Sequence, residues 1–321
     1  MISGDRTILP IQEKEFFMMS NPKFLPVSGT FLDGIACDIP ANNWTRKVWR
    51  AALREQKEMG IDTLIVIRVG WRNSAMYDSK VMQCTLRDPD DLLEFLLSEA
   101  DELGMKVFVG LFDSGKYWVV NDWQGEVDLN SRLMDEMEER YLKHPSWTGW
   151  YISHEGDIKF HQEKVWKPLA RKMRGDTPDK KILISPRYAG RKYEPQFAVT
   201  PELHVRHFEY LYGEMAGLID YAAFMDGHVD FAELDSFMAA TREVSDRFGV
   251  EFWSNLETFD RDMPWKFPPI EWQKMRLKLE IAQKYAKKVI TFEAPHFLSS
   301  YSCFPAAVRL RECYLEYLEG R

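Results

Sequence analysis

The feature that most constrains this sequence is an alternation, repeated eight times, between a short apolar run of β-forming residues and a longer segment with helical periodicity. The predicted strands are residues 27–33, 63–69, 106–113, 147–155, 181–188, 218–226, 250–257 and 288–293. Solid apolar runs of this kind are typical of strands that are buried on both faces of a parallel sheet. The alternation therefore predicts βαβ units, whose crossover helices cover the sheet.

The predicted helices have apolar residues three and four positions apart, and several end at a glycine. They are residues 44–59, 88–103, 128–142, 165–173, 204–215, 234–248, 272–286 and 306–318. Gly60, Gly104 and Gly249 stand where a left-handed stop residue is expected. Eight such units close naturally into a single (β/α)8 TIM barrel, an α/β fold. An open doubly wound sheet is the alternative, but no G-x-G-x-x-G motif follows the first strand.

The barrel domain is predicted to span residues 27–321, and residues 1–26 form a short N-terminal extension. The 321 residues are within the size range of one such barrel. A net charge of −8 disfavours nucleic acid and anionic membrane surfaces as partners. There is no apolar run long enough to span a membrane. Residues 1–10 lack the apolar core of a signal peptide, so we expect a cytoplasmic protein, or a periplasmic or secreted one if a signal has been removed.

The cysteines give no sign of a metal or redox centre. They are scattered at Cys37, Cys84, Cys303 and Cys313, without a CxxC spacing. Free thiols are the expected state, and neither a metal nor another cofactor is predicted.

Polar residues stand at the end of every predicted strand, and this is the main functional signal. They are Asp33, Arg68, Asp113, Glu155, Arg187, Asp226, Glu257 and Glu293. The carboxyl ends of the strands share one face of a barrel, and barrel enzymes carry their active sites there. Carboxylates crowded together raise one another's pKa, which keeps one of them protonated near neutral pH.

Side-chain alternation along the strands predicts which residues face the barrel interior. An inward Glu257 places Asn255 and Trp253 inward as well. An inward Glu155 leaves Trp150 and Ile152 facing the helices, and His154 outward. An inward Glu293 leaves Ile290 and Phe292 outward.

Two carboxylates on opposite sides of a pocket are the minimal machinery for hydrolysis of a glycosidic bond. A barrel with Glu at the ends of strands four and seven resembles the large clan of retaining glycosidases. The resemblance implies that Glu155 is the acid/base and Glu257 the nucleophile or base, and Glu293 could replace either partner. That clan usually has Asn before the strand-four Glu, where this chain has His154.

A second resemblance covers about the first half of the chain. Residues 29–33 (GTFLD), the helix that begins at Trp44, residues 59–65 (MGIDTLI), and residues 149–151 (GWY) followed by Glu155 carry it. They resemble an uncharacterised bacterial family of glycosidase-like barrels of unknown function. This resemblance implies the same fold and class without giving a substrate; the glycosidase hypothesis itself predicts a carbohydrate substrate.

Aromatic and charged residues near the strand ends are predicted to bind that substrate. The predicted substrate-binding residues are Asp33, Arg68, Trp71, Asp113, Trp118, Arg187, Tyr188, Asp226, Asn255 and Glu293. Flat aromatic faces pack against the C–H side of sugar rings, and arginines hold hydroxyls or an acidic sugar. Further aromatic candidates are Tyr77, Tyr117, Trp123, Tyr193 and Trp265.

Two other functions fit the same residues. A metal-dependent sugar isomerase or hydrolase could use ligands from the set His154, Glu155, Asp226, His228, Glu257, Glu293 and His296, although no two histidines have a recognised ligand spacing. A carbohydrate-binding barrel without catalysis is the other alternative.

Overall fold

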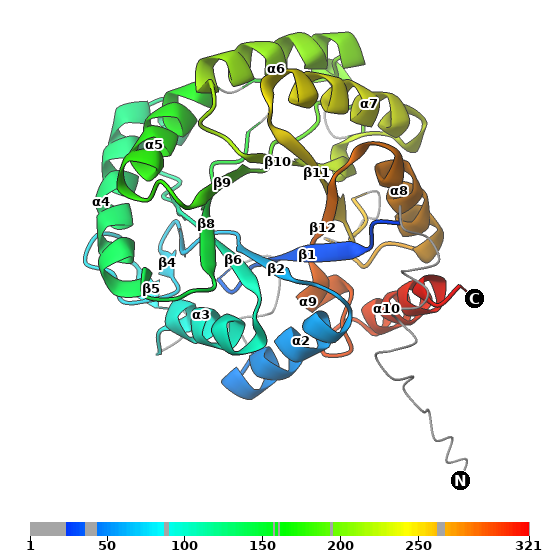
Figure 1. Ribbon diagram of the computed structural model, residues 1–321, viewed down its shortest axis with the longest axis horizontal. Coiled ribbons are helices and arrows are strands. Elements are labelled where there is room, and N and C mark those ends of the chain that lie inside the picture. Colours follow the sequence, from blue (N-terminus) through cyan, green and yellow to red (C-terminus); the bar gives the residue numbers. More distant parts are fainter. Residues whose placement is uncertain are drawn as a thin grey trace.

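The computed structural model describes residues 24–35, 44–86, 90–156, 158–159, 161–192, 195–261 and 267–320. Its centre is a closed barrel of parallel strands (Figure 1) in the order β1-β12-β11-β10-β9-β8-β6-β2. The strands are β1 (Val27–Leu32), β2 (Thr63–Val66), β6 (Lys106–Gly110), β8 (Trp147–Ile152), β9 (Lys181–Ile184), β10 (Tyr221–Met225), β11 (Glu251–Glu257) and β12 (Lys288–Phe292). The predicted (β/α)8 barrel is confirmed.

Helices form a ring around the barrel (Figure 1). They are α2 (Arg46–Glu58), α3 (Leu92–Leu103), α4 (Trp123–Tyr141), α5 (Glu163–Asp176), α6 (Pro201–Met215), α7 (Phe231–Phe248), α8 (Trp272–Tyr285) and α10 (Pro305–Leu318). Their ends follow capping chemistry, because Asp91 accepts from the Glu94 amide at the start of α3 and Gly104 ends that helix in the left-handed region. None of the helices in the described part of the chain is long and apolar enough to cross a membrane.

Two layers of apolar side chains form the core. The outer layer fills the space between strands and helices and includes Trp150, Ile152, Phe252 and Leu256. The inner layer fills the barrel and consists of Phe31, Ile65, Ile67, Phe108, Tyr151, Leu183, Ala223, Trp253 and Ile290. The opening at the centre of the ribbon is therefore a packed core rather than a pore.

The predicted side-chain directions hold for β8 and β11 and fail for β12. Trp150 and Ile152 face the helices and Trp253 faces inward, as predicted. Ile290, predicted to face outward, belongs to the inner layer, and Phe292, also predicted to face outward, packs against that layer. The prediction counted alternate residues back from Glu293, but β12 ends at Phe292. Glu293 occupies the N-cap position of the short helix α9 (Ala294–Phe297), where strand alternation no longer applies.

A small second sheet, which the sequence did not predict, lies beyond the ends of β2 and β6. It consists of β3 (Gly70–Trp71), β4 (Ser74–Ala75), β5 (Thr85–Leu86) and β7 (Phe112–Asp113). Trp71 pairs in register with Asp113 in this sheet. The sheet therefore brings these two residues from different βα loops to one place.

Some predictions fall outside the described residues. They concern the extension over residues 1–23, Cys37, the start of the second-unit helix at residues 88–89, Tyr193 and Trp265. Among the cysteines that the structure describes, Cys84, Cys303 and Cys313 are free thiols.

Candidate active site

The polar residues at the carboxyl ends of the strands gather into two groups. The first, the Arg68 cluster, contains Arg68, Asp33, Asp113, Glu155 and Tyr151, whose charges act on one another. The second, the Glu257 cluster, contains Glu257, Arg261, Asp226 and Lys278. Because all barrel strands run parallel, both groups lie on the face where barrel enzymes bind substrate.

Glu155 is the half-buried acid of the Arg68 cluster. Its Oε1 accepts a hydrogen bond of 2.9 Å from the Tyr151 hydroxyl. Burial raises the pKa of Glu155 above its ordinary value, and the Arg68 charge and the Tyr151 hydrogen bond offset this effect only in part. The carboxyl group at the end of β8 is therefore suited to hold a proton and release it.

Ser153 fixes the segment that carries Glu155. Its hydroxyl donates to the Ile67 carbonyl at 2.5 Å and accepts from the Leu111 amide at 2.7 Å. One side chain thereby ties the end of β8 to the chain that leaves β2 and β6. This cross-link limits the movement of Glu155 relative to the neighbouring strand ends.

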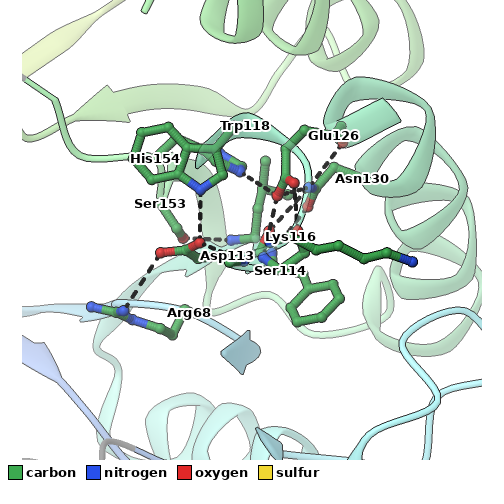
Figure 2. Close-up of polar contacts among 12 residues, drawn as sticks. Arg68, Asp113, Ser114, Lys116, Trp118, Glu126, Asn130, Ser153 and His154 are labelled. Atoms are coloured by element: carbon green, nitrogen blue, oxygen red, sulfur yellow. Dashed lines mark hydrogen bonds and ion pairs between the residues drawn. The ribbon is translucent and has the colours of Figure 1, made fainter. Parts of the chain in front are cut away.

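Asp113 links the Arg68 cluster to an aromatic side chain at the mouth of the barrel. Its Oδ1 accepts from the Trp118 indole at 2.9 Å and from the Gly115 amide at 3.1 Å, while its Oδ2 lies 4.0 Å from Nη1 of Arg68. Figure 2 shows Arg68 and Trp118 approaching this carboxylate from different sides. Asp113 therefore positions Trp118, which is half-buried, near the strand ends.

A fully buried network supports Asp113 and Trp118 from the helix side (Figure 2). Nε2 of His154 lies 2.8 Å from Oε1 of Glu126 on α4, and the Ser114 hydroxyl donates to Oε2 of Glu126 at 2.5 Å. The His154 hydrogen bond lowers the pKa of Glu126 although burial opposes this. His154 thus points outward as predicted and contacts Glu126 of α4. Its imidazole ring also packs edge-to-face against the Trp118 ring, with 5.6 Å between the ring centroids.

Glu257 is held as an anion by a two-point contact with Arg261. The Arg261 guanidinium donates from Nε to Oε2 and from Nη2 to Oε1, both at 2.8 Å. Burial alone would raise the pKa of Glu257, but the Arg261 charge and these hydrogen bonds lower it to about 2. Glu257 is 2% exposed, so its charge depends on this partner.

Asp226 and Lys278 fix the end of β11 through hydrogen bonds to the backbone of Glu257. Oδ1 of Asp226 accepts from the Glu257 amide at 3.0 Å and from Lys278 of α8 at 2.7 Å, and Lys278 also donates to the Glu257 carbonyl at 3.1 Å. Burial raises the pKa of Asp226, and Lys278 offsets this in part. A Cβ atom at Gly227 would lie 1.6 Å from Oε2 of Glu257, so only glycine leaves room for the carboxylate.

The Glu293 carboxylate contacts the backbone of Asp33 and the ring of His296. Its Oε2 accepts from the Asp33 amide at 3.0 Å, and its Oε1 lies 2.5 Å from Nδ1 of His296 on α9. The His296 ring stacks on Trp44 at 5.6 Å. Burial raises the pKa of Asp33 to about 6, with Arg68 opposing the rise and Glu293 adding to it.

The structure brings most of the predicted site residues together but buries several of them against other protein groups. Tyr188 was wrongly predicted to bind substrate: it is 1% exposed, stacks on Phe224, and is hydrogen-bonded to Thr241 of α7. Strand β9 ends at Ile184, so Tyr188 no longer follows the strand direction. Tyr77 is likewise buried in the outer core.

Three other predicted substrate ligands are engaged with protein groups. Asp226 faces Lys278 on the helix side, Glu293 faces His296, and Asn255 donates to the Ser185 hydroxyl at 3.3 Å in the barrel interior. These three residues support the site. Arg187 acts on the charge of Glu155 from the end of β9, and Trp71 stacks against Arg72 at the mouth.

The sequence did not single out Tyr151, Glu126, Arg261 or Lys278. Of these four residues, only Tyr151 could have been predicted. It precedes Glu155 by four residues, and alternate residues of a barrel strand face the interior, so an inward Glu155 implies an inward Tyr151. Arg261 lies in a loop and Lys278 on a helix, where no periodic pattern marks them. Within the described part of the chain, no three His, Cys, Asp or Glu side chains are arranged to hold a metal ion.

Residues 27–303 of the chain match the family model described as domain of unknown function DUF4434. No curated protein matches the sequence at a significant level. A protein of Bacteroides thetaiotaomicron VPI-5482, whose crystal structure is described as that of a "putative alpha-L-fucosidase", is 34% identical, with a TM-score of 0.89 and coverage of 100% of this chain and 99% of that chain. The predicted resemblance to an uncharacterised family of glycosidase-like barrels is confirmed.

Two more distant structures share the fold. An endo-1,4-beta-D-mannanase of Thermotoga petrophila RKU-1 is 13% identical, with a TM-score of 0.59 and coverage of 91% of this chain and 100% of that chain. A thermostable mutant of a xylanase of Cellvibrio japonicus is 11% identical, with a TM-score of 0.56 and coverage of 92% and 98%. The chain thus has a fold that glycoside hydrolases use.

Proposed function

The chain belongs to the DUF4434 family, and we propose that it hydrolyses a glycosidic bond with Glu155 as acid/base and Glu257 as nucleophile or base. One observation carries the proposal. The environments of these two glutamates shift their pKa values in opposite directions, upward for Glu155 and down to about 2 for Glu257. Acid and base pairs commonly have pKa values shifted apart by their surroundings, and both glutamates stand at the carboxyl ends of barrel strands, on the same face of the barrel.

The chemistry follows from the two protonation states. Glu155 donates its proton to the glycosidic oxygen as the bond between that oxygen and the anomeric carbon breaks. Ionised Glu257 attacks the anomeric carbon, or removes a proton from a water molecule that attacks it. In the first case water then releases the sugar from Glu257, and Glu155 accepts the proton of that water.

The similar proteins support a carbohydrate substrate. The Bacteroides protein is named for action on fucosides, and the mannanase and the xylanase are named for action on polysaccharides. Trp71 and Trp118 flank the Arg68 cluster and are half-buried, as aromatic platforms for sugar rings are.

The test is a hydrolysis screen on aryl glycosides and oligosaccharides. It compares the wild type with Glu155→Gln, Glu257→Gln, Glu293→Gln and the exposed control Glu243→Gln. Turnover by the wild type should fall by roughly 10²- to 10⁴-fold in Glu155→Gln and at least as far in Glu257→Gln, with the control unchanged. Full activity in Glu257→Gln and loss in Glu293→Gln would contradict the assignment of Glu257. Runs with EDTA and with added divalent metal test the metal-dependent alternative.

A carbohydrate-binding barrel without catalysis is the second candidate, and the two-point contact of Glu257 with Arg261 favours it. Both oxygens of Glu257 are occupied, as they are in a structural ion pair. This candidate predicts no turnover by the wild type on any substrate. It also predicts that an oligosaccharide ligand binds to the wild type and to Glu257→Gln with equal affinity, which isothermal titration calorimetry measures.

A further inference from the structure

Arg68 has hydrogen-bonding capacity that the protein does not use. Its side chain is 17% exposed, and in the described chain its only ion-pair contact is Asp113 Oδ2, 4.0 Å from Nη1. Its Nε is buried and has no hydrogen-bond partner among the residues that the structure describes. A guanidinium carries five N–H donors, and contacts with carboxylates normally measure 2.7 to 2.9 Å. A buried donor without a partner is costly, so the arrangement favours a ligand that brings acceptors to Arg68.

Unused acceptors lie in the same cluster. Oδ1 of Asp33 is buried and, like Nε of Arg68, has no hydrogen-bond partner among the described residues, and Asp33 is 4% exposed. Within the described ranges, Oδ2 of Asp113 meets only the distant guanidinium, since the Trp118 and Gly115 hydrogen bonds go to Oδ1. The charges of Asp33 and Asp113 both act on Arg68. Donors and acceptors are therefore both left open in one place.

Building on the proposed function, we propose that Arg68, Asp33 and Asp113 form a subsite that binds adjacent hydroxyl groups of a neutral sugar next to Glu155. A sugar hydroxyl donates one hydrogen bond and accepts others. It can therefore donate to a carboxylate and accept from the guanidinium at the same time. Two neighbouring hydroxyls match the fork of an arginine, which presents parallel donors.

The charge balance of the subsite selects a neutral sugar over a uronic acid. Arg68 and Arg187 bring two positive charges to Glu155, while Asp33, Asp113 and Glu155 are three carboxyl groups. Even with the proton on Glu155, two carboxylates balance the two arginines. A substrate carboxylate offers only acceptors and would face Asp33 and Asp113 without a proton to give them. It would fit Arg68 alone and be repelled by the rest of the subsite.

The experiment measures binding of free monosaccharides, so it does not depend on turnover. Isothermal titration calorimetry, with saturation-transfer NMR for weak ligands, compares L-fucose, D-xylose, D-mannose and D-galactose with D-galacturonate and D-glucuronate. We expect at least one neutral sugar to bind saturably to the wild type and more tightly than either uronate. Tighter binding of a uronate, or no saturable binding of any neutral sugar, would overturn the proposal.

Variants then assign the binding to the subsite. Arg68→Gln should lower the affinity for the neutral sugar by at least about tenfold, as expected when charge-assisted hydrogen bonds are lost. Asp33→Asn should lower that affinity less. Arg68→Lys keeps the buried charge but loses the fork, so it should fold like the wild type and still bind more weakly. Arg309→Gln, on the exposed face of α10, is the charge-matched control and should bind normally.

The outcomes separate this proposal from the proposed function. Unchanged affinity in both Arg68→Gln and Arg68→Lys, with thermal melts like those of the wild type, would overturn the subsite even if the enzyme hydrolyses glycosides. Arg68-dependent binding of a neutral sugar by a protein that hydrolyses no glycoside would support the subsite and contradict the proposed hydrolase activity. If Arg68→Gln does not fold, the Arg68→Lys comparison decides.

Discussion

Glu155 and Glu257 are both glutamates at the carboxyl end of a barrel strand, the first half-buried and the second buried, yet their surroundings differ in kind. Glu155 has a neutral hydrogen-bond donor, Tyr151, and its arginine belongs to a cluster shared with two aspartates. Glu257 has a guanidinium of its own at 2.8 Å on both oxygens. Burial acts on both, but only Glu257 has a partner close enough to reverse its effect.

The difference teaches that the position of a carboxyl group in a barrel does not set its role. Contact geometry does, because a direct two-point ion pair in a buried place outweighs the cost of removing a charge from water, whereas a shared arginine at longer range does not. Substitutions that remove or add one contact at a time test this explanation.

The largest effect is expected from Arg261→Met, which removes the feature that separates the two sites. Glu257 would remain buried without a counter-charge, which typically costs about 3 to 5 kcal/mol in free energy of unfolding. Urea denaturation at pH 7 measures the loss. Arg276→Met on α8, which breaks an exposed pair with Glu280, is the matched control and should change little. Equal stability of the two variants would show that the Arg261 contact is not formed in solution.

Next in size is a pair of opposite stability effects in Glu257→Gln and Glu155→Gln. A pKa of about 2 instead of 4.5 means that ionised Glu257 contributes roughly 3 kcal/mol above pH 4.5, lost as the pH falls toward 2. For Glu155 the pKa is raised, so its contribution is present below pH 4.5 and is lost as the pH rises through the folded value. At pH 7, Glu257→Gln should be destabilised and Glu155→Gln should not.

The measurement for this pair is urea denaturation at several pH values between 3 and 7. The deficit of Glu257→Gln should shrink as the pH falls, and Glu155→Gln should lose any advantage over the wild type. Parallel pH curves for the two variants would contradict the distinction between the sites.

A smaller effect is expected from Gly227→Ala, which pushes Glu257 away from its position. The added methyl would meet Oε2 at 1.6 Å, so the carboxylate or the backbone must move, at a typical cost of about 1 to 3 kcal/mol. Gly175→Ala on α5 is the control, since nothing lies within 4 Å of its Cβ position. Thermal unfolding of both variants measures the difference. A Gly227→Ala variant as stable as the control would place Glu257 elsewhere.

The smallest effect is expected from Tyr151→Phe. The hydroxyl that holds Glu155 is lost, at a cost of about 1 kcal/mol, while the ring stays in the barrel interior. Because that hydrogen bond lowers the pKa of Glu155, its removal should raise the pKa further and move the alkaline limb of the pH–rate profile to higher pH. A limb that moves to lower pH would argue against Glu155 as the acid.

The sequence predicted the barrel because its signal is repeated and local. Eight apolar runs with helices between them leave few alternatives, and pleat alternation correctly placed Trp253 inward and Trp150 outward. Glu155 and Glu257 were chosen as candidates because strand ends mark one face of the barrel, and their catalytic roles stay a prediction.

The partners that give these residues their character could not be found in the same way. Arg261 and Lys278 reach Glu257 or its backbone from a loop and a helix, so only the packed structure brings them there. Tyr188 failed as a substrate ligand because β9 ends earlier than its apolar run suggests. Alternation along a strand carries no information beyond the residue where the strand ends.

Side-chain carbon NMR of the glutamates, followed from pH 2 to pH 8, measures directly whether the pKa values of Glu155 and Glu257 are shifted in opposite directions. Comparison with Glu155→Gln and Glu257→Gln assigns the two carboxyl signals. We expect the pKa of Glu155 to lie above the ordinary glutamate value of 4.5 and that of Glu257 near 2, so that one is the acid and the other the anion. Titration of both at the same pH, or in the reverse order, would contradict it.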